Sequence, residues 1–229
     1  MRARVESGTL PPEGVRTMFD RIAPVYDLMN RVMTGGLDRR WRLATVRAVV
    51  EEGDFVLDAC CGTGDLAIAA EREGAFVTGL DFSERMLERA RRKGPGIEWV
   101  QGDLLAMPFD DGYFNAAVVG FGVRNVDDLE RALAELRRVL GEGGRVGILE
   151  ITQPRGLLRH FYRVWFDRVV PLVGKVLPGG EAYTYLPASV RRFPDAVELA
   201  RLLRAAKFTD VEYRRFAGGI VALHTGVAS

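Results

Sequence analysis

Short apolar runs alternate with stretches of helical periodicity through the middle of this 229-residue chain. The apolar runs have the length of strands, and the stretches between them repeat apolar residues at the spacing of a helix that buries one face. The expected strands are 55–58, 76–80, 97–101, 114–120 and 145–151, and the expected helices are 65–73, 83–92 and 127–140. This alternation predicts an α/β fold with a doubly wound, mostly parallel sheet and right-handed crossovers.

Both ends of the chain depart from the alternation. Residues 15–50 have the apolar spacing of helices, whereas the far end has a helical stretch at 196–206 and two strand-like runs around Ala217-Gly218-Gly219, which predict an antiparallel hairpin. The length suits one sizeable α/β domain. We therefore predict a single domain over 1–229, made of a helical cap (15–50), a sheet core (51–151), an insertion (152–187), and a closing helix and hairpin (188–229).

The predicted insertion is apolar and aromatic, with arginines interspersed. A segment of this kind suits a lid over an apolar substrate, or a surface element that contacts a membrane interface. Packing against the core would give the same composition. The sequence therefore marks 152–187 as a candidate lid and leaves its partner open.

A glycine loop follows the first predicted strand, in the stretch VLDACCGTGDL at 56–66. Gly62 and Gly64 allow the backbone to approach a ligand closely. The helix that opens at Asp65 offers unpaired N–H groups and the positive end of its dipole. Together these features predict a site for a nucleotide-like cofactor.

Two cofactors fit this loop, because residues 62–67 also match the dinucleotide pattern G-x-G-x-x-[GA]. The acid at Asp58 favours S-adenosylmethionine over NAD. A pyrophosphate would be repelled there, whereas the ammonium and sulfonium groups of S-adenosylmethionine would be attracted. An NAD-dependent oxidoreductase stays as the alternative from another class.

Asp58, Asp81 and Asp103 follow the first three predicted strands. Since the carboxyl ends of parallel strands meet at one edge of a sheet, we expect three carboxylates along one rim. Asp81 would accept hydrogen bonds from both ribose hydroxyls. The other expected contacts are Phe82 beside the adenine face, Asp103 on the exocyclic amine, Leu104 through its N–H and side chain, and Asp58, Gly62 and Thr63 on the methionine part.

Charge and cysteine content exclude several classes of protein. The net charge is +1, from 32 basic and 31 acidic residues, so the chain lacks the basic excess typical of proteins that bind nucleic acid.

Cys60 and Cys61 are adjacent, with Cα atoms about 3.8 Å apart, too close for an ordinary disulfide. We expect them to pack the loop in a reducing, cytoplasmic location. No signal peptide, membrane span or metal site is expected.

From Val15 onward, nearly the whole chain resembles the menaquinone/ubiquinone biosynthesis C-methyltransferases, within the class I S-adenosylmethionine-dependent methyltransferases. The motifs that carry the resemblance are Tyr26-Asp27-x-Met29-Asn30 with Trp41, Gly122-Val123-Arg124-Asn125, and Arg138-Val139-Leu140 followed by Gly143-Gly144 and Glu150. The resemblance implies strand order 3-2-1-4-5-7-6 with the last strand antiparallel, and S-adenosylmethionine as cofactor. It implies methylation of a ring carbon of a polyprenylated hydroquinone, with demethylmenaquinol favoured.

The resemblance also implies residue roles. Arg124 would hold the phenolate or a deprotonating water, and Asn125 and Tyr26 would orient the ring. The alternative for Arg124 is a salt bridge to a neighbouring acid. Gly120 stands where the family has a cofactor-contacting Ser, so its contact would be made by backbone alone. The glycine loop, with Gly62, Thr63 and Gly64, would hold the cofactor, although Cys61 replaces the family's first glycine there.

Departures from the family pattern leave the identity of the methyl acceptor open. Thr34 and Asp38 stand where the family commonly has Ser and His, so a methyltransferase for another small apolar acceptor is the runner-up. His160 and His224 titrate in the right range for a base, but their places in the insertion and the last strand favour structural roles. Contact with the inner face of the membrane and a homodimer are candidate associations.

Overall fold

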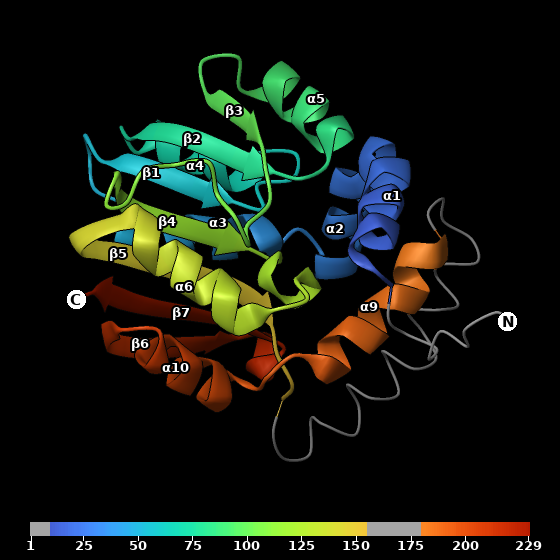
Figure 1. Cartoon of the computed structure of the whole chain (residues 1–229). Helices are drawn as coiled ribbons and strands as arrows, with labels where there is room; N and C mark the ends of the chain where they lie inside the picture. The colour runs from blue at the N-terminus through green and yellow to red at the C-terminus, as the bar shows by residue number, and fades with distance from the viewer. Residues whose placement is uncertain (1–9, 155–179) are drawn as a thin grey trace, which may run out of the picture.

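The computed structural model of the chain describes residues 10–154 and 180–229. These residues form one seven-stranded sheet in the order β3-β2-β1-β4-β5-β7-β6 (Figure 1). The strands are β1 (Phe55–Ala59), β2 (Phe76–Asp81), β3 (Glu98–Gln101), β4 (Phe114–Gly120), β5 (Leu140–Ile151), β6 (Phe208–Phe216) and β7 (Val221–Ala228). The first five strands pair in parallel, and β7 is antiparallel to both of its neighbours. The predicted fold and strand order are confirmed.

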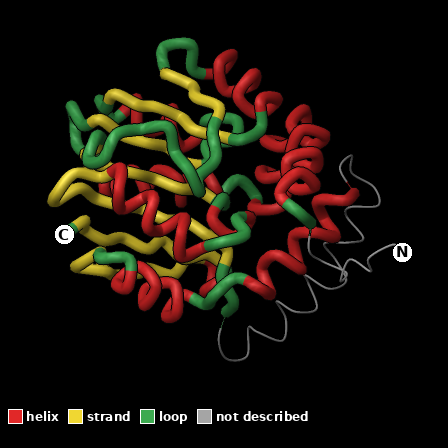
Figure 2. Tube along the Cα trace, in the orientation of Figure 1, coloured by secondary structure: helices red, strands yellow, loops and turns green. Residues whose placement is uncertain are grey.

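Helices cover both faces of the sheet (Figure 2). They are α1 (Pro12–Ile22), α2 (Tyr26–Thr34), α3 (Asp38–Val49), α4 (Asp65–Arg72), α5 (Glu84–Lys93), α6 (Leu129–Val139), α9 (Gly180–Arg192) and α10 (Ala196–Ala205), with short turns η1 (Ala23–Val25), η2 (Val123–Asn125) and η4 (Ala217–Gly219). Because side chains alternate across a strand, Val56 packs in one cluster with α3 and α4, and Leu57 in another with α6 and α10.

Polar side chains fix where several helices begin. The Ser83 hydroxyl accepts from the backbone N–H of Met86 at the start of α5, and the Asp128 carboxylate accepts from Arg131 at the start of α6. The Asp195 carboxylate accepts from two N–H groups of α10. Each N-cap satisfies donors that a helix leaves unpaired at its first turn.

The cap helices stand at one end of the sheet. In Figure 1 the arrowheads of β1, β2 and β4 point to the side occupied by α1, α2 and α9. Apolar side chains of α1, among them Val15, Met18 and Ile22, pack with Met86 of α5 and Tyr185 of α9 in one buried cluster. The carboxyl ends of the strands therefore face the cap across the space where the candidate residues lie.

Most boundaries agree with the sequence prediction within two residues, and two differ by more. Strand β5 begins at Leu140, because Leu140 pairs with Phe114 before a register shift that skips 141–144. Helix α9 runs across the expected boundary at 187, with Pro187 inside it. Most of the expected insertion, and His160 with it, lies outside the described residues. Within the described residues, no helix is long and apolar enough to cross a membrane.

Candidate active site

The glycine loop turns the chain from β1 into α4 with two glycines in the left-handed region. Gly62 has φ 55° and its N–H donates to Asp81 Oδ2 at 2.8 Å. Gly64 has φ 83°, and a Cβ built there would lie 2.4 Å from the Trp99 ring. Gly62 therefore serves the loop's hydrogen bond to β2, whereas Gly64 is required by packing against β3.

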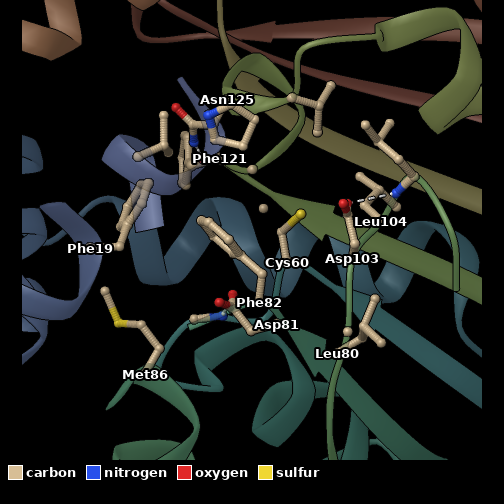
Figure 3. Close-up of a pocket in the computed structure, with 18 of the residues that line it drawn as sticks. Phe19, Cys60, Leu80, Asp81, Phe82, Met86, Asp103, Leu104, Phe121 and Asn125 are labelled. Carbon is tan, nitrogen blue, oxygen red and sulfur yellow. Dashed lines mark hydrogen bonds between the residues drawn. The ribbon is translucent and has the colours of Figure 1, made fainter. Parts of the chain in front are cut away.

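Asp81 ends β2 with both carboxylate oxygens engaged. Oδ2 accepts from Gly62, and Oδ1 accepts from the N–H of Ser83 at 2.9 Å. Burial raises the pKa of Asp81 to about 6, against the effect of these hydrogen bonds, which lower it. Each oxygen keeps a second lone pair, and the side chain lines a cavity (Figure 3).

Asp58 is the last residue but one of β1 and is 1% exposed. Its Oδ2 accepts from the N–H of Ala67 in α4 at 2.8 Å, and its Oδ1 has no partner among the described residues. Burial raises the pKa of Asp58 to about 7; Arg42 acts in the opposite direction. Asp58 does not line the cavity, so it would act on a ligand there through its charge.

We call the first cavity, of about 110 Å³, the loop cavity. Figure 3 shows Asp81, Phe82, Asp103 and Leu104 around it. Asp103 accepts from the N–H of Leu105 at 2.9 Å. The predicted residues that line the loop cavity are Tyr26, Gly62, Asp81, Phe82, Asp103, Leu104, Gly120 and Asn125; further lining residues include Phe19, Cys60, Phe121 and Asp127. The structure therefore brings most of the predicted residues together.

A second, larger cavity of about 370 Å³ lies between the cap and the end of the sheet; we call it the cap cavity. Its walls are mostly apolar. They include Met29 and Met33 of α2, Trp41 of α3, Ile151 of β5 and Ile220 beside β7. The sequence analysis singled out Trp41 but did not predict this cavity, because the periodicity of its lining residues is that of any helix with a buried face.

Three aromatic side chains belong to both cavities. Phe19 of α1, Tyr26 of α2 and Phe121 after β4 line the loop cavity and the cap cavity alike. The two cavities therefore adjoin, and these three rings form their common wall.

The turn η2 places its two polar residues on different sides of this wall. Asn125 lines the loop cavity; its amide nitrogen donates to the Phe121 carbonyl at 3.4 Å and its Oδ1 has no partner among the described residues. Arg124 lines the cap cavity. Arg124 and Asn125 are thus adjacent in the sequence but line different cavities.

Arg124 forms a buried ion pair with Glu150 of β5. Its Nη1 lies 2.7 Å from Glu150 Oε1, and the two side chains are 9% and 1% exposed. Burial lowers the pKa of Arg124, but Glu150, Tyr26 and Tyr185 together raise it above its ordinary value. The salt bridge considered as an alternative is therefore present, and Arg124 Nε still has no partner among the described residues.

Thr63 and Gly64 line neither cavity. Thr63 donates to Asp27 of α2, and Lys93 of α5 contacts Asp27, Thr63 and Asp65. We call Asp27, Thr63, Asp65 and Lys93 the polar latch, because they join the cap to the glycine loop and to α5.

The remaining candidates lie as follows. Cys60 and Cys61 are free thiols, as expected, and burial raises their pKa values well above the ordinary range. His224 is buried in β7, where Nε2 lies 2.8 Å from the Ala196 carbonyl. It lines neither cavity, and burial lowers its pKa. Within the described part of the chain, no cluster of side chains could hold a metal ion.

The fold is similar to that of solved methyltransferases. An S-adenosylmethionine-dependent methyltransferase of Thermotoga maritima, described as a possible histamine N-methyltransferase, has a TM-score of 0.70 at 22% identity, covering 93% of this chain and 99% of its own. The cyclase SpnF also has a TM-score of 0.70, at 18% identity, covering 97% and 98%. At such identities the likeness shows the fold alone.

Relatives by sequence are closer. A demethylmenaquinone methyltransferase of Thermus thermophilus is 44% identical over 218 residues, covering 91% of this chain and 99% of its own. The ubiquinone/menaquinone biosynthesis C-methyltransferase UbiE of Desulfotalea psychrophila is 43% identical, covering 99% and 95%. A family model described as the ubiE/COQ5 methyltransferase family matches residues 8–228. The chain belongs to the ubiE/COQ5 methyltransferase family.

Proposed function

We propose that this protein transfers a methyl group from S-adenosylmethionine to a ring carbon of a polyprenylated hydroquinone, converting demethylmenaquinol to menaquinol. The observation that carries the proposal is the common wall of Phe19, Tyr26 and Phe121 between a cavity rimmed by acids and a larger apolar one. A methyl donor and an acceptor ring in these two places would meet at that wall.

The loop cavity suits S-adenosylmethionine. When bound, this cofactor supplies an electrophilic methyl group on a positively charged sulfur. Asp81 would take the ribose hydroxyls on its spare lone pairs, and Phe82 and Leu104 offer apolar contact for the adenine. Asn125 Oδ1, which is buried and has no partner in the described part of the chain, could accept from the ligand. The carboxylates of Asp81 and Asp103, which line the cavity, favour a cation there and oppose the pyrophosphate of NAD, and Asp58 adds to this effect when it is ionised.

The cap cavity suits an apolar aromatic acceptor. Its methionines and Trp41 offer an apolar surface. A prenylated ring would bury its apolar area there, at roughly 25 cal/mol per Å² removed from water.

Arg124 and Tyr26 would serve the chemical step. A ring carbon becomes nucleophilic once a neighbouring hydroxyl loses its proton. Because its pKa is raised, Arg124 keeps its own proton and would stabilise the phenolate through its Nε, which has no partner within the described parts of the chain. Tyr26 reaches both cavities and would hold the ring against the donor; such positioning supplies several kcal/mol, up to roughly 7–11.

A methyl-transfer assay tests the proposal. Purified protein, S-adenosylmethionine and dithionite-reduced demethylmenaquinone should yield menaquinone, seen by mass spectrometry as a gain of one methylene unit. A panel with demethylubiquinol analogues and unprenylated phenols sets the acceptor class. Transfer to none of the hydroquinones, with S-adenosylmethionine bound, would overturn the proposed acceptor; failure to bind S-adenosylmethionine would overturn the reaction itself.

The proposed acceptor is lipophilic, and this property bears on where in the cell the protein meets it. We propose that the protein works in the cytoplasm and meets its acceptor at the membrane surface, supported by the exposed side chains of Leu28 and Val32, 56% and 55% exposed beside Arg31 on α2. Sedimentation with anionic vesicles should carry the protein down, and replacing both apolar residues by Ser should abolish this. Light scattering measures the homodimer that the family resemblance suggests.

A further inference from the structure

The cap cavity has polar side chains where α2 meets α3. Asn30, Thr34 and Asp38 are four residues apart and line the cavity together; we call them the polar corner. Arg124, the cavity's buried arginine, lies on η2 after β4. The cavity therefore has polar groups contributed by two separate parts of the fold.

Hydrogen-bonding capacity is left over in the polar corner. The Asn30 amide nitrogen is buried and has no partner among the described residues. Thr34 Oγ1 lies 2.7 Å from the Asn30 carbonyl and 2.9 Å from Asp38 Oδ1, and one hydroxyl proton can serve only one of them. Asp38 is 5% exposed, and it forms an ion pair with Arg42 in which Nε lies 3.7 Å from Oδ2, longer than a hydrogen bond.

A helix cap does not account for Asp38. It is the first residue of α3, but the residue before it, Leu37, is the N-cap, and no side chain caps this helix end. A buried donor or acceptor without a partner costs roughly 1–3 kcal/mol. The Asn30 donor, which has no partner among the described residues, and the Asp38 carboxylate, whose Oδ2 has no hydrogen bond to Arg42, line the same cavity, so together they suit a ligand group that both accepts and donates.

We propose that Asn30 and Asp38 bind the second hydroxyl of the dihydroxy aromatic acceptor, the one that is not beside Arg124. This inference rests on the proposed function. A hydroxyl accepts from the Asn30 amide and donates to the Asp38 carboxylate at the same time. The carbonyl of an oxidised quinone only accepts, and it would face the Asp38 oxygen without a proton between them. The polar corner thus selects the reduced, dihydroxy form of the ring.

A pair of acceptors separates this role from a merely structural one. The first is a short-chain prenylated 1,4-naphthohydroquinone, kept reduced with dithionite. The second is the naphthol that retains the hydroxyl next to the methylated carbon and carries hydrogen in place of the other. The full-length enzyme and the variants Asn30→Leu and Asp38→Asn are compared by kcat/KM on both acceptors, with S-adenosylmethionine affinity measured by calorimetry. Asp110→Asn, an exposed acid away from both cavities, is the matched control.

The wild type and Asp110→Asn should prefer the dihydroxy acceptor by about tenfold or more. In Asn30→Leu and Asp38→Asn this preference should fall towards one, because kcat/KM drops for the dihydroxy acceptor and changes less than about threefold for the naphthol, with cofactor affinity unchanged. Equal losses on both acceptors in both variants would overturn the inference. If the wild type methylates neither acceptor, the proposed function fails instead.

Discussion

At the scale of single residues, the carboxylates buried beside the glycine loop make the stability of the protein depend on pH. Asp58 and Asp81 both have pKa values raised by burial, to about 7 and about 6. The sequence placed these acids correctly at strand ends, because chain topology alone brings strand ends to one rim. It did not show that Asp58 turns towards α4, since that depends on which face of β1 packs against which helix.

The first prediction concerns Asp58. Its folded pKa of about 7 exceeds the unfolded value of 3.8, so its contribution to stability is complete below pH 3.8 and is lost as pH rises through 7. The loss amounts to about 1.4 kcal/mol per pH unit at most within that window. Asp58→Asn should therefore gain stability relative to wild type between pH 4 and 7, measured as the urea unfolding free energy. The contribution of Asp81 to stability falls with rising pH in the same way, but Asp81 is present in both proteins. If the unfolding free energies of wild type and Asp58→Asn changed in parallel with pH, the raised pKa of Asp58 would be contradicted.

The second prediction concerns the buried pair. Arg124→Ala should lower kcat by roughly 10²–10³-fold with S-adenosylmethionine affinity nearly unchanged, because it removes a charge that would stabilise the phenolate. Glu150→Gln should cost about 3–5 kcal/mol of unfolding free energy, because Arg124 stays buried and unpaired. Arg47→Ala, which breaks an exposed pair with Glu73, should cost less than about 1 kcal/mol. Retained turnover in Arg124→Ala would leave Arg124 with a structural role only.

At the scale of elements, polar contacts with the glycine loop hold α2 in position. Besides the polar latch, Ser83 donates to Asp20 and Arg89 donates to the Pro24 carbonyl, so the cap is joined to α5 by several polar contacts. The periodic strands and helices of 55–139 were predictable within a residue or two, because their faces are buried in layers. The start of β5 was not, because the expected helix 127–140 included Leu140, which in fact already pairs with β4.

The third prediction concerns the polar latch. Lys93→Ala should raise the KM for S-adenosylmethionine severalfold and speed hydrogen exchange in 26–34, because α2 loses its tie to the loop. The side chain of Lys93 is 30% exposed, so the cost in stability should stay below about 1 kcal/mol and shrink with salt. Arg91→Ala breaks the exposed pair with Glu84 on the same helix and is the control. Equal exchange in both variants would show that the latch does not hold α2.

At the scale of the whole molecule, the fold holds two adjoining cavities at the carboxyl ends of its strands. The strand order follows from the family resemblance together with the hairpin signal, and helical periodicity alone could not have ordered the strands. The cap cavity escaped prediction because α1, α2, α3, η4 and α9 form it together, and no single segment carries its pattern. The loop cavity was predictable because one motif and the strand ends define it.

The fourth prediction separates the cavities. Met33→Trp fills part of the cap cavity and should lower kcat/KM for the hydroquinone by roughly 10²-fold, with S-adenosylmethionine affinity within about twofold of wild type. Asp81→Ala should do the reverse, weakening the cofactor by about tenfold or more, because a charged acceptor is lost. Calorimetry and steady-state kinetics measure the two effects. If either variant lost hydroquinone turnover and S-adenosylmethionine affinity to the same extent, the two cavities would not act as separate sites.

Since Phe19, Tyr26 and Phe121 belong to both cavities, the two ligands cannot be thermodynamically independent. Whichever molecule arrives first fixes rings that the other must pack against, and the coupling is equal in both directions. Titrations of one ligand at fixed levels of the other should therefore give synergy rather than a single constant affinity, and the demethylated cofactor should leave more slowly while the product ring remains.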